Sequence, residues 1–153
     1  HLGWNNVSDA FLVGSGNLGA ALLGYRGFEQ YGMKIVLAFD SDPAKTHQVI
    51  HDVHILPMEE LPSMAERMKI QIGILAVPAE HAQATAEKMI QAGIRAIWNF
   101  APAKLFVPAN VVVQNEDLAE GLAVLSVKLA RTKEKNLAGL ETAPETLRAQ
   151  KEK

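Results

Sequence analysis

The chain has 153 residues, 48% hydrophobic and 21% charged, a balance typical of one soluble globular domain and unlike disordered, collagen-like or membrane-spanning chains. It contains no cysteine, which excludes disulfides, thiolate nucleophiles and cysteine-ligated zinc. With 15 basic and 17 acidic residues the net charge is −2, so the chain lacks the positive excess by which a free-standing DNA-binding protein attracts phosphates. No secretory leader or transmembrane run is visible, so we expect a cytoplasmic location and no membrane partner.

In the first half of the chain, β-rich runs alternate with helical stretches. The expected elements, in order, are a strand at 7–13, a helix at 20–23, a strand at 34–39, a short helix from Asp42 and Pro43, and a strand at 54–55. Proline favours a helix start because its missing N–H is one that the first turn leaves unbonded anyway. The order strand, glycine-rich turn, helix at the beginning is the informative one.

The second half continues the alternation. The expected elements are a helix at 58–68, strands at 70–77, 94–98 and 111–113, a helix at 79–92 between the first two strands, and a final helix at about 116–131. The run 70–77 is almost continuously apolar, as expected of a central strand buried on both faces. On the final helix, four leucines at i, i+4, i+7 and i+11 form one apolar stripe that needs a partner surface: Leu118, Leu122, Leu125 and Leu129.

This alternation predicts an α/β fold of the Rossmann type, a doubly wound and mostly parallel sheet. We expect one domain over residues 1–131, with the final helix included. Residues 132–153 are polar and interrupted by Gly139 and Pro144, so we expect them to form a flexible tail.

A G-x-G-x-x-G motif lies at the turn after the first strand. Gly14 permits the tight turn, Gly16 lets the backbone approach a pyrophosphate, and Gly19 allows close packing of helix on strand. Asp40, 21 residues past the last glycine, stands where a carboxylate binds the adenosine ribose and repels a 2′-phosphate. The motif therefore predicts a dinucleotide site that prefers NAD(H) to NADP(H). The alternative is a glycine turn that binds no ligand, with Asp40 only capping the next helix.

Two further turns should face the same crevice, because ligands of open α/β sheets bind beyond the carboxyl ends of the strands. The first contains Val77 and Pro78, which can pack on a dinucleotide. The second runs from Asn99 to Pro102 and offers an amide and an aromatic ring. Alternatively, the prolines of these turns merely end the strands.

Histidines are the remaining candidates for chemistry. His47, His51 and His54 have the spacing of a helical metal site, yet the chain leaves the helix near Asp52, so we expect solvated side chains and no metal. His81 follows the Pro78 turn and is interpreted as a surface residue. The sequence therefore predicts a binding site and no catalytic residue.

Several segments resemble the nucleotide-binding domain of the Rex family of redox-sensing transcriptional repressors, over about Trp4 to Leu129. The segments are Phe11–Leu22, Tyr25–Phe28, Ala38–Pro43, Ala76–Ala79, Gly93–Ile94, Asn99–Pro102 and Gln114–Leu118. The asparagine after the second glycine and the Asn-Phe-Ala-Pro turn are not general Rossmann features, which makes the resemblance specific.

The resemblance implies a repressor that senses the NADH/NAD+ ratio and releases operator DNA when NADH binds. It implies a homodimer whose C-terminal helix, carrying the four leucines, is swapped between subunits, and a redox switch formed by Tyr25 and Asp117. Operator DNA would be bound by an N-terminal winged-helix domain that these residues do not include. The implied cofactor contacts are Gly14, Ser15, Gly16, Asn17, Leu18, Gly19, Asp40, Ser41, Val77, Pro78, Asn99, Phe100, Ala101 and Pro102.

Two other functions stay open at this point. The chain could be the cofactor domain of an NAD-dependent dehydrogenase, or a CoA-binding domain like that of acyl-CoA synthetases. Asp40 speaks against the second of these.

Overall fold

The computed structural model describes residues 8–116 and 118–142. The chain divides into two compact units, one up to Glu116 and a second from Asp117 onwards. Within the described residues no helix is both long enough and apolar enough to cross a membrane.

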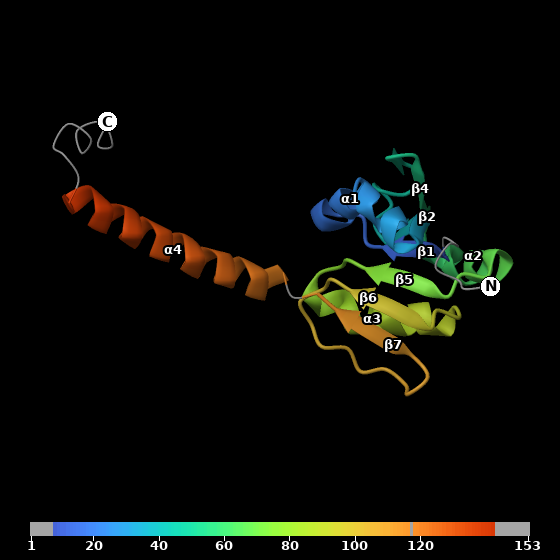
Figure 1. The fold of residues 1–153 in the computed structure, drawn as a ribbon. Coiled ribbons are helices and arrows are strands. Elements are labelled where there is room, and N and C mark those ends of the chain that lie inside the picture. The colour runs from blue at the N-terminus through green and yellow to red at the C-terminus, as the bar shows by residue number, and fades with distance from the viewer. Residues whose placement is uncertain (1–7, 117, 143–153) are drawn as a thin grey trace. The chain divides into compact units, whose positions relative to one another are not determined.

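The first unit is built on a seven-stranded sheet with the order β3-β4-β2-β1-β5-β6-β7 (Figure 1). The strands are β1 (Ser8–Val13), β2 (Met33–Asp40), β3 (Val49–Ile50), β4 (Val53–Pro57), β5 (Ile72–Leu75), β6 (Ala96–Asn99) and β7 (Val112–Asn115). Every pairing is parallel except that of β3 with β4. The predicted doubly wound α/β fold is confirmed.

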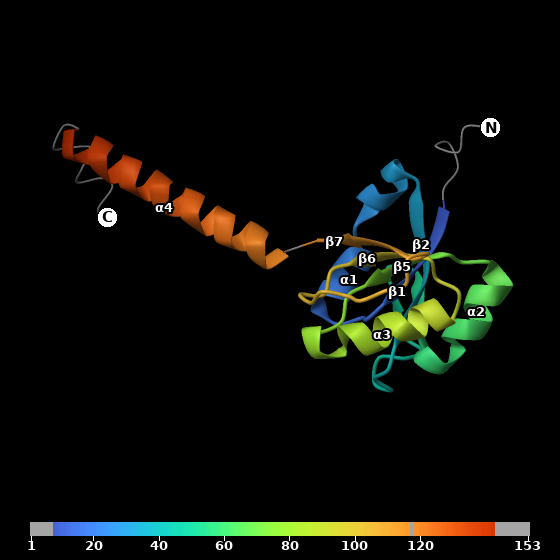
Figure 2. The same ribbon diagram turned by 90° about the horizontal axis from the view of Figure 1, so that it is seen from below.

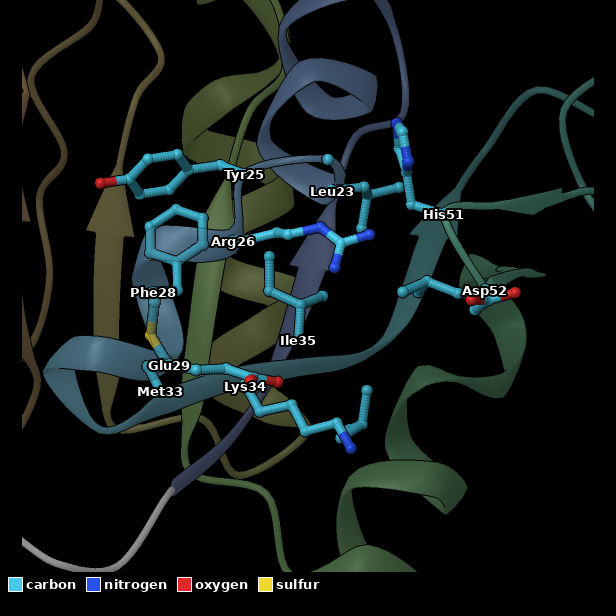
Figure 3. Close-up of a pocket in the computed structure, with 13 residues that line it drawn as sticks. Leu23, Tyr25, Arg26, Phe28, Glu29, Met33, Lys34, Ile35, His51 and Asp52 are labelled. Atoms are coloured by element: carbon cyan, nitrogen blue, oxygen red, sulfur yellow. The ribbon is translucent and has the colours of Figure 1, made fainter.

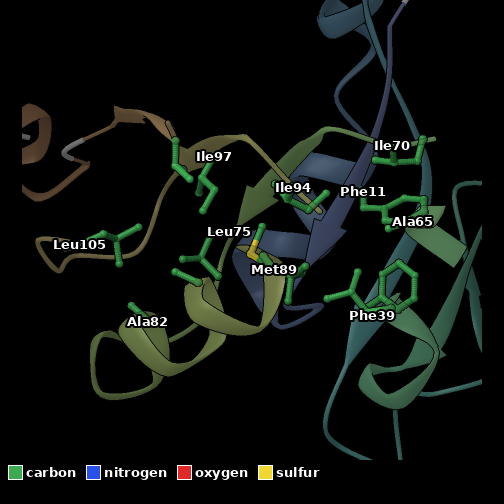
Figure 4. Close-up of a cluster of buried hydrophobic side chains, with 14 of the residues drawn as sticks. Phe11, Phe39, Ala65, Ile70, Leu75, Ala82, Met89, Ile94, Ile97 and Leu105 are labelled. Atoms are coloured by element: carbon green, nitrogen blue, oxygen red, sulfur yellow. The ribbon is translucent and has the colours of Figure 1, made fainter. Parts of the chain in front are cut away.

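Helices cover both faces of the sheet. They are α1 (Asn17–Leu23), α2 (Leu61–Met68) and α3 (Ala79–Gln91), with the 3-10 helices η1 (Arg26–Tyr31) and η2 (Met58–Glu60). Helices α2 and α3 lie on one side of the sheet (Figure 2). One buried cluster joins the sheet to α2 and α3, and includes Phe11, Phe39, Ala65, Leu75 and Met89 (Figure 4). The second cluster lies under α1 and η1, so we call the sheet surface on that side the α1 face.

Beyond α1 and η1, no helix within residues 8–116 covers the α1 face. The connection from β6 to β7, residues 100–111, contains no helix. As a result Trp98 is only half-buried on this face, and Val112 on β7 is 68% exposed. A doubly wound sheet usually has a crossover helix at such a connection, so this part of the α1 face is an apolar surface left open.

The parallel strands end together at one edge, which the register makes explicit. Val13 lies opposite Phe39 and Leu75, Leu75 lies opposite Asn99, and Asn99 lies opposite Asn115. Backbone hydrogen bonds continue this alignment past the strand ends: each of the next residues on β1, β5, β6 and β7 donates its N–H to a neighbouring strand, at 2.8–2.9 Å, namely Gly14, Ala76, Phe100 and Glu116. The turns that follow the strands are therefore held side by side.

Two predictions about local structure were wrong. No helix follows Asp42; residues 43–47 form turns, and β3 and β4 make a hairpin whose turn residues His51 and Asp52 both have positive φ, 50° and 66°. A hairpin turn of this kind matches the twist of its strands, which the short helical signal did not reveal.

The C-terminal helix was also predicted too short. Helix α4 runs from Leu118 to Thr142, so it includes eleven residues that we expected in the flexible tail. The segment after Arg131 is polar but rich in Lys, Glu, Leu and Ala, which are strong helix formers, and Gly139 near its end does not break it. Polarity was mistaken for lack of structure.

Candidate functional site

The glycine-rich turn between β1 and α1 is shaped by close backbone approaches. Gly14 has φ +102°, and a Cβ there would strike the Ala76 carbonyl; a Cβ at Gly19 would strike the carbonyl of Gly14. Gly16 differs, because a Cβ there would meet no atom within 4 Å. Two glycines are thus required by the fold, whereas Gly16 faces open space of the kind that a pyrophosphate needs.

Asp40 lies at the end of β2 and binds this turn. Its Oδ2 accepts hydrogen bonds from the Ser15 backbone N–H (2.8 Å) and from the Ser15 hydroxyl (2.6 Å). Its Oδ1 accepts one from the backbone N–H of Asp42 (2.9 Å). Ser15 is 3% exposed, so its hydroxyl is buried against the carboxylate.

These contacts determine the charge of the site. Burial alone would raise the pKa of the Asp40 carboxyl, but the hydrogen bonds from Ser15 and from the Asp42 N–H, together with the nearby Lys45 ammonium, outweigh burial and hold the pKa below its ordinary value of 3.8. Asp40 is therefore ionised at neutral pH. A fixed negative charge at this position repels a phosphate and attracts hydroxyl donors.

A cavity of about 520 Å³ opens beside the glycine-rich turn and Asp40. We call it the glycine-loop cavity. Predicted cofactor contacts that line it are Gly14, Ser15, Gly16, Asp40, Ser41, Val77 and Pro78. Residues from three separate strand ends thus meet around one hollow, as the topology predicted.

The sequence missed other residues of the glycine-loop cavity. Lys45, Met58, Thr85 and Lys88 line it, and so does His81, which we had placed on the surface only. They come from the turn after β2, from η2 and from α3, and no motif links them in sequence. Only the packing of α3 on the sheet brings them to the cavity.

The remaining predicted contacts lie outside the glycine-loop cavity. Asn17 is exposed at the start of α1, while Leu18 is half-buried against the cluster under α1. In the turn after β6, Phe100 is half-buried, Ala101 is buried and Pro102 is exposed. These turn residues share the carboxyl edge with the cavity, because the Phe100 N–H donates to the Leu75 carbonyl at 2.8 Å.

Asn99 corrects one expectation. It is 1% exposed, and its amide nitrogen donates to the Ala103 carbonyl (2.9 Å) and to Asn115 Oδ1 (3.1 Å), while its own Oδ1 accepts from the Ala101 N–H (3.0 Å). Both N–H groups of the amide that we expected to offer to a ligand are bonded inside the protein, and its oxygen already accepts one hydrogen bond. Its role in the structure is to shape the turn, because a buried amide left without partners is costly.

Tyr25 borders a different hollow. It follows α1, is 55% exposed, and lines a cavity of about 560 Å³ together with Arg26, Ile35 and His51 (Figure 3). Its ring packs edge-on against Phe28, with centroids 4.8 Å apart. The other predicted switch residue, Asp117, lies outside the described residues, so the pairing of the two stays a prediction.

An aromatic row crosses the open part of the α1 face. It continues from Phe28 to Trp98 (5.5 Å between centroids) and from Trp98 to Phe100 (5.2 Å). The indole N–H of Trp98 donates to Glu116 Oε1 at 3.1 Å. The row thus connects Tyr25, the turn after β6 and the last residue of the first unit.

The described residues contain no group of three or more His, Cys, Asp or Glu side chains that could hold a metal ion. His47 and His51 both have positive φ and lie in the turns around β3, which rules out the one-helix arrangement that their spacing suggested.

Comparison with known proteins places this site in a family. The family described as CoA binding domain matches residues 5–103, more than half of the chain. The chain belongs to this family. The sequence of this chain is also similar to those of proteins named redox-sensing transcriptional repressor Rex. The protein of Treponema denticola is 46% identical over 128 residues, which are 84% of this chain and 61% of that relative.

The protein of Desulfitobacterium hafniense, also named Rex, is 46% identical over 125 residues, covering 82% of this chain and 60% of the relative. The chain therefore spans about three fifths of the length of these curated relatives. The resemblance to the Rex repressors that the motifs indicated is confirmed.

Solved structures of RSP, a Rex-family repressor, give the same result. RSP in complex with β-NADH has a TM-score of 0.77 and 36% identity, covering 90% of this chain and 66% of RSP. RSP in complex with β-NAD+ and operator DNA has a TM-score of 0.76 and 37% identity, covering 93% of this chain and 65% of RSP. Enzymes such as UDP-D-quinovosamine 4-dehydrogenase of Vibrio fischeri share the fold alone, at 16% identity and a TM-score of 0.54.

Proposed function

We propose that this chain is the NAD(H)-binding, redox-sensing part of a transcriptional repressor, and that NADH binding releases operator DNA held by a segment outside it. The observation that carries the proposal is the ionised Asp40 beside a turn whose middle glycine leaves room for a pyrophosphate. It is supported by the likeness to RSP, which has been solved with β-NADH and with β-NAD+ and operator DNA.

In this proposal each part of the edge has a task. The Gly14–Gly19 turn holds the pyrophosphate, Asp40 and Ser41 hold the adenosine ribose, and Val77, Pro78 and the 99–102 turn face the nicotinamide. The bound group would supply a ring whose charge and shape differ between its two redox states. A pocket that prefers one state shifts the population of two protein conformations. Tyr25 and Asp117 report that shift.

We further propose a homodimer formed through α4. The open part of the α1 face needs a cover, and α4 has apolar side chains without burial: Leu125 is 62% exposed and Leu129 is 55% exposed. A swapped helix from a second copy satisfies both surfaces, because burying each removes apolar area from water.

Regulation is favoured over catalysis for one reason. The residues assigned to the nicotinamide end, namely Val77, Pro78 and 99–102, include no side chain that titrates near neutral pH. A dehydrogenase needs a proton-transferring group there. The histidine that lines the glycine-loop cavity, His81, is exposed to solvent on α3. We therefore propose that the chain is not an enzyme, and that NADH consumption stays at background level with any carbonyl acceptor.

The family description gives a second candidate, binding of coenzyme A. Asp40 argues against it, because the 3′-phosphate of coenzyme A would bring negative charge to a ribose held by a carboxylate.

Titration calorimetry with NADH, NAD+, NADPH and coenzyme A tests the proposal. We expect NADH to bind most tightly, NAD+ more weakly, and NADPH and coenzyme A weaker than both. Asp40→Asn should weaken NADH binding by roughly 10- to 100-fold, the loss expected for a hydrogen bond to a charged group, and should reduce the preference over NADPH. Asp52→Asn, which lines the Tyr25 cavity, is the control. Tighter binding of NADPH or coenzyme A than of NADH in the unmodified protein contradicts the proposal.

A further inference from the structure

The carboxylate of Asp40 is nearly saturated by the protein itself. A carboxylate accepts about four hydrogen bonds, two on each oxygen. Oδ2 already accepts two, from the Ser15 N–H and the Ser15 hydroxyl, and Oδ1 accepts one from the Asp42 N–H. One acceptor position is left, and it is on Oδ1.

The Ser15 hydroxyl is not free to move away from Asp40. Ser15 is 3% exposed, and among the described residues its hydroxyl has no hydrogen-bond acceptor other than Oδ2. A buried hydroxyl that gives up its only partner loses free energy without recovering it from water. A ribose, however, presents two neighbouring hydroxyl groups to a carboxylate at this position.

We propose that the Ser15 hydroxyl restricts Asp40 to a single hydrogen bond with the adenosine ribose, and so lowers the affinity for NADH and NAD+ by the same factor. The inference rests on the proposed function, since it concerns the adenosine end of the same site. Ser15 is thus a residue that determines absolute affinity. It leaves the discrimination between redox states to the nicotinamide end, where the two forms differ.

The backbone makes this inference testable by a small substitution. Ser15→Ala removes only the hydroxyl, while the N–H groups of residues 15 and 42 still orient the carboxylate. The freed position on Oδ2 can then accept a second ribose hydroxyl. No buried donor is left unpaired in the variant, so the fold should be preserved.

The experiment is calorimetry of the unmodified protein and of Ser15→Ala with NADH, NAD+ and ADP-ribose, which lacks the nicotinamide. We expect all three ligands to bind about 10-fold more tightly to the variant, the lower end of the range for one hydrogen bond to a charged group, with the NADH/NAD+ affinity ratio unchanged. Ser63→Ala is the matched control: Ser63 is an exposed serine on α2 that does not line the glycine-loop cavity, so the loss of its hydroxyl should leave all three affinities unchanged. Thermal unfolding of each variant verifies the fold.

Three results would overturn the inference about Ser15. Weaker binding of all three ligands to Ser15→Ala would show that the hydroxyl holds the carboxylate in its binding orientation. Unchanged binding would show that the hydroxyl does not compete, and an altered NADH/NAD+ ratio would show that the effect reaches the nicotinamide. Failure of the unmodified protein to bind any of the three ligands would remove the proposed function together with this inference, so the two failures are distinguishable.

Discussion

Two glycines of one motif have separable duties, which matters for how the motif is tested. Gly19 is packed against the carbonyl of Gly14, whereas Gly16 has an ordinary φ of −70° and faces the cavity. A methyl group at Gly19 would disturb the contact of α1 with the end of β1. A methyl group at Gly16 would occupy space that we assign to the pyrophosphate.

We expect Gly16→Ala and Gly19→Ala to give opposite results. Gly19→Ala should lower the free energy of unfolding by about 1–3 kcal/mol through overpacking, measured by urea denaturation. Gly16→Ala should leave that free energy unchanged and abolish NADH binding in calorimetry. Retained NADH binding by a folded Gly16→Ala protein would place the pyrophosphate elsewhere.

Among single residues, the sequence predicted the features that depend on neighbouring positions in the chain. It missed the hydrogen bonds between residues that only the folded structure brings together. The spacing of Gly14, Gly16 and Gly19, with Asp40 at the end of the next strand, is a local pattern with a known geometry. Asn99 was misinterpreted because its partners, Ala103 and Asn115, are selected by turn shape and strand register. The hydrogen bond between Ser15 and Asp40 could not be seen, since an α/β glycine turn tolerates several residues at that position.

Among the elements, strand β7 has an unusual connection to its neighbour. The indole of Trp98 on β6 donates to Glu116, the residue that follows β7 and precedes the second unit. This bond fixes the end of the sheet on the α1 face, while Asn99 and Asn115 fix it on the opposite face. The exit of the chain from the sheet is therefore held on both sides.

The Trp98 bond can be followed optically, because the only other tryptophan is Trp4 and can be replaced by Phe. In that background Glu116→Leu should shift the emission of Trp98 to shorter wavelength, since the indole loses its hydrogen bond, and lower the free energy of unfolding by about 1 kcal/mol. Glu116→Gln keeps an oxygen acceptor and should behave like the parent. Identical spectra for the Leu and Gln variants would mean that the bond does not form in solution.

Element types were predicted better than their extents. The strand at 70–77 was interpreted from its apolar run, yet the strand covers only Ile72–Leu75. Ile70 packs in the core before the strand begins, and Ala76, whose N–H still bonds to the Val13 carbonyl, already starts the turn. Our prediction ended helix α4 too early, because it followed the hydrophobic periodicity, which stops before the run of helix-forming residues does. The hairpin of β3 and β4 depends on two positive-φ residues that are not glycine, a conformation with no sequence signal here.

At the scale of the whole molecule, two apolar surfaces are exposed, and binding of a second copy would cover both. Among the described residues of the first unit, the connection from β6 to β7 adds no helix to the α1 face, and on helix α4 Leu125 and Leu129 are exposed. The four-leucine stripe was predicted from sequence, and Leu125 and Leu129 are exposed in the single chain. The side chains of Leu118 and Leu122 lie outside the described residues. Dimerisation itself is not readable from either surface alone and stays a proposal.

Leu129→Asp should convert the dimer into monomers, because it would bury an unpaired charge in the interface. Sedimentation velocity measures the change directly. Val127→Asp is the control: Val127 is 50% exposed on the side of α4 away from the leucine stripe, where the same charge stays in solvent. Dissociation of both variants, or of neither, would contradict an interface formed by the stripe.

The alignment of strand ends has a consequence for signalling distance. The glycine-rich turn after β1 and the end of β7 are separated by three strand spacings, about 15 Å in all. Hydrogen bonds bridge every one of those gaps at the same rim. The proposed ligand site at the glycine-rich turn and the residue that precedes α4, Glu116, are therefore close to each other. In our proposal, a ligand bound along this edge moves the segment after Glu116 directly, without a change in the core of the sheet.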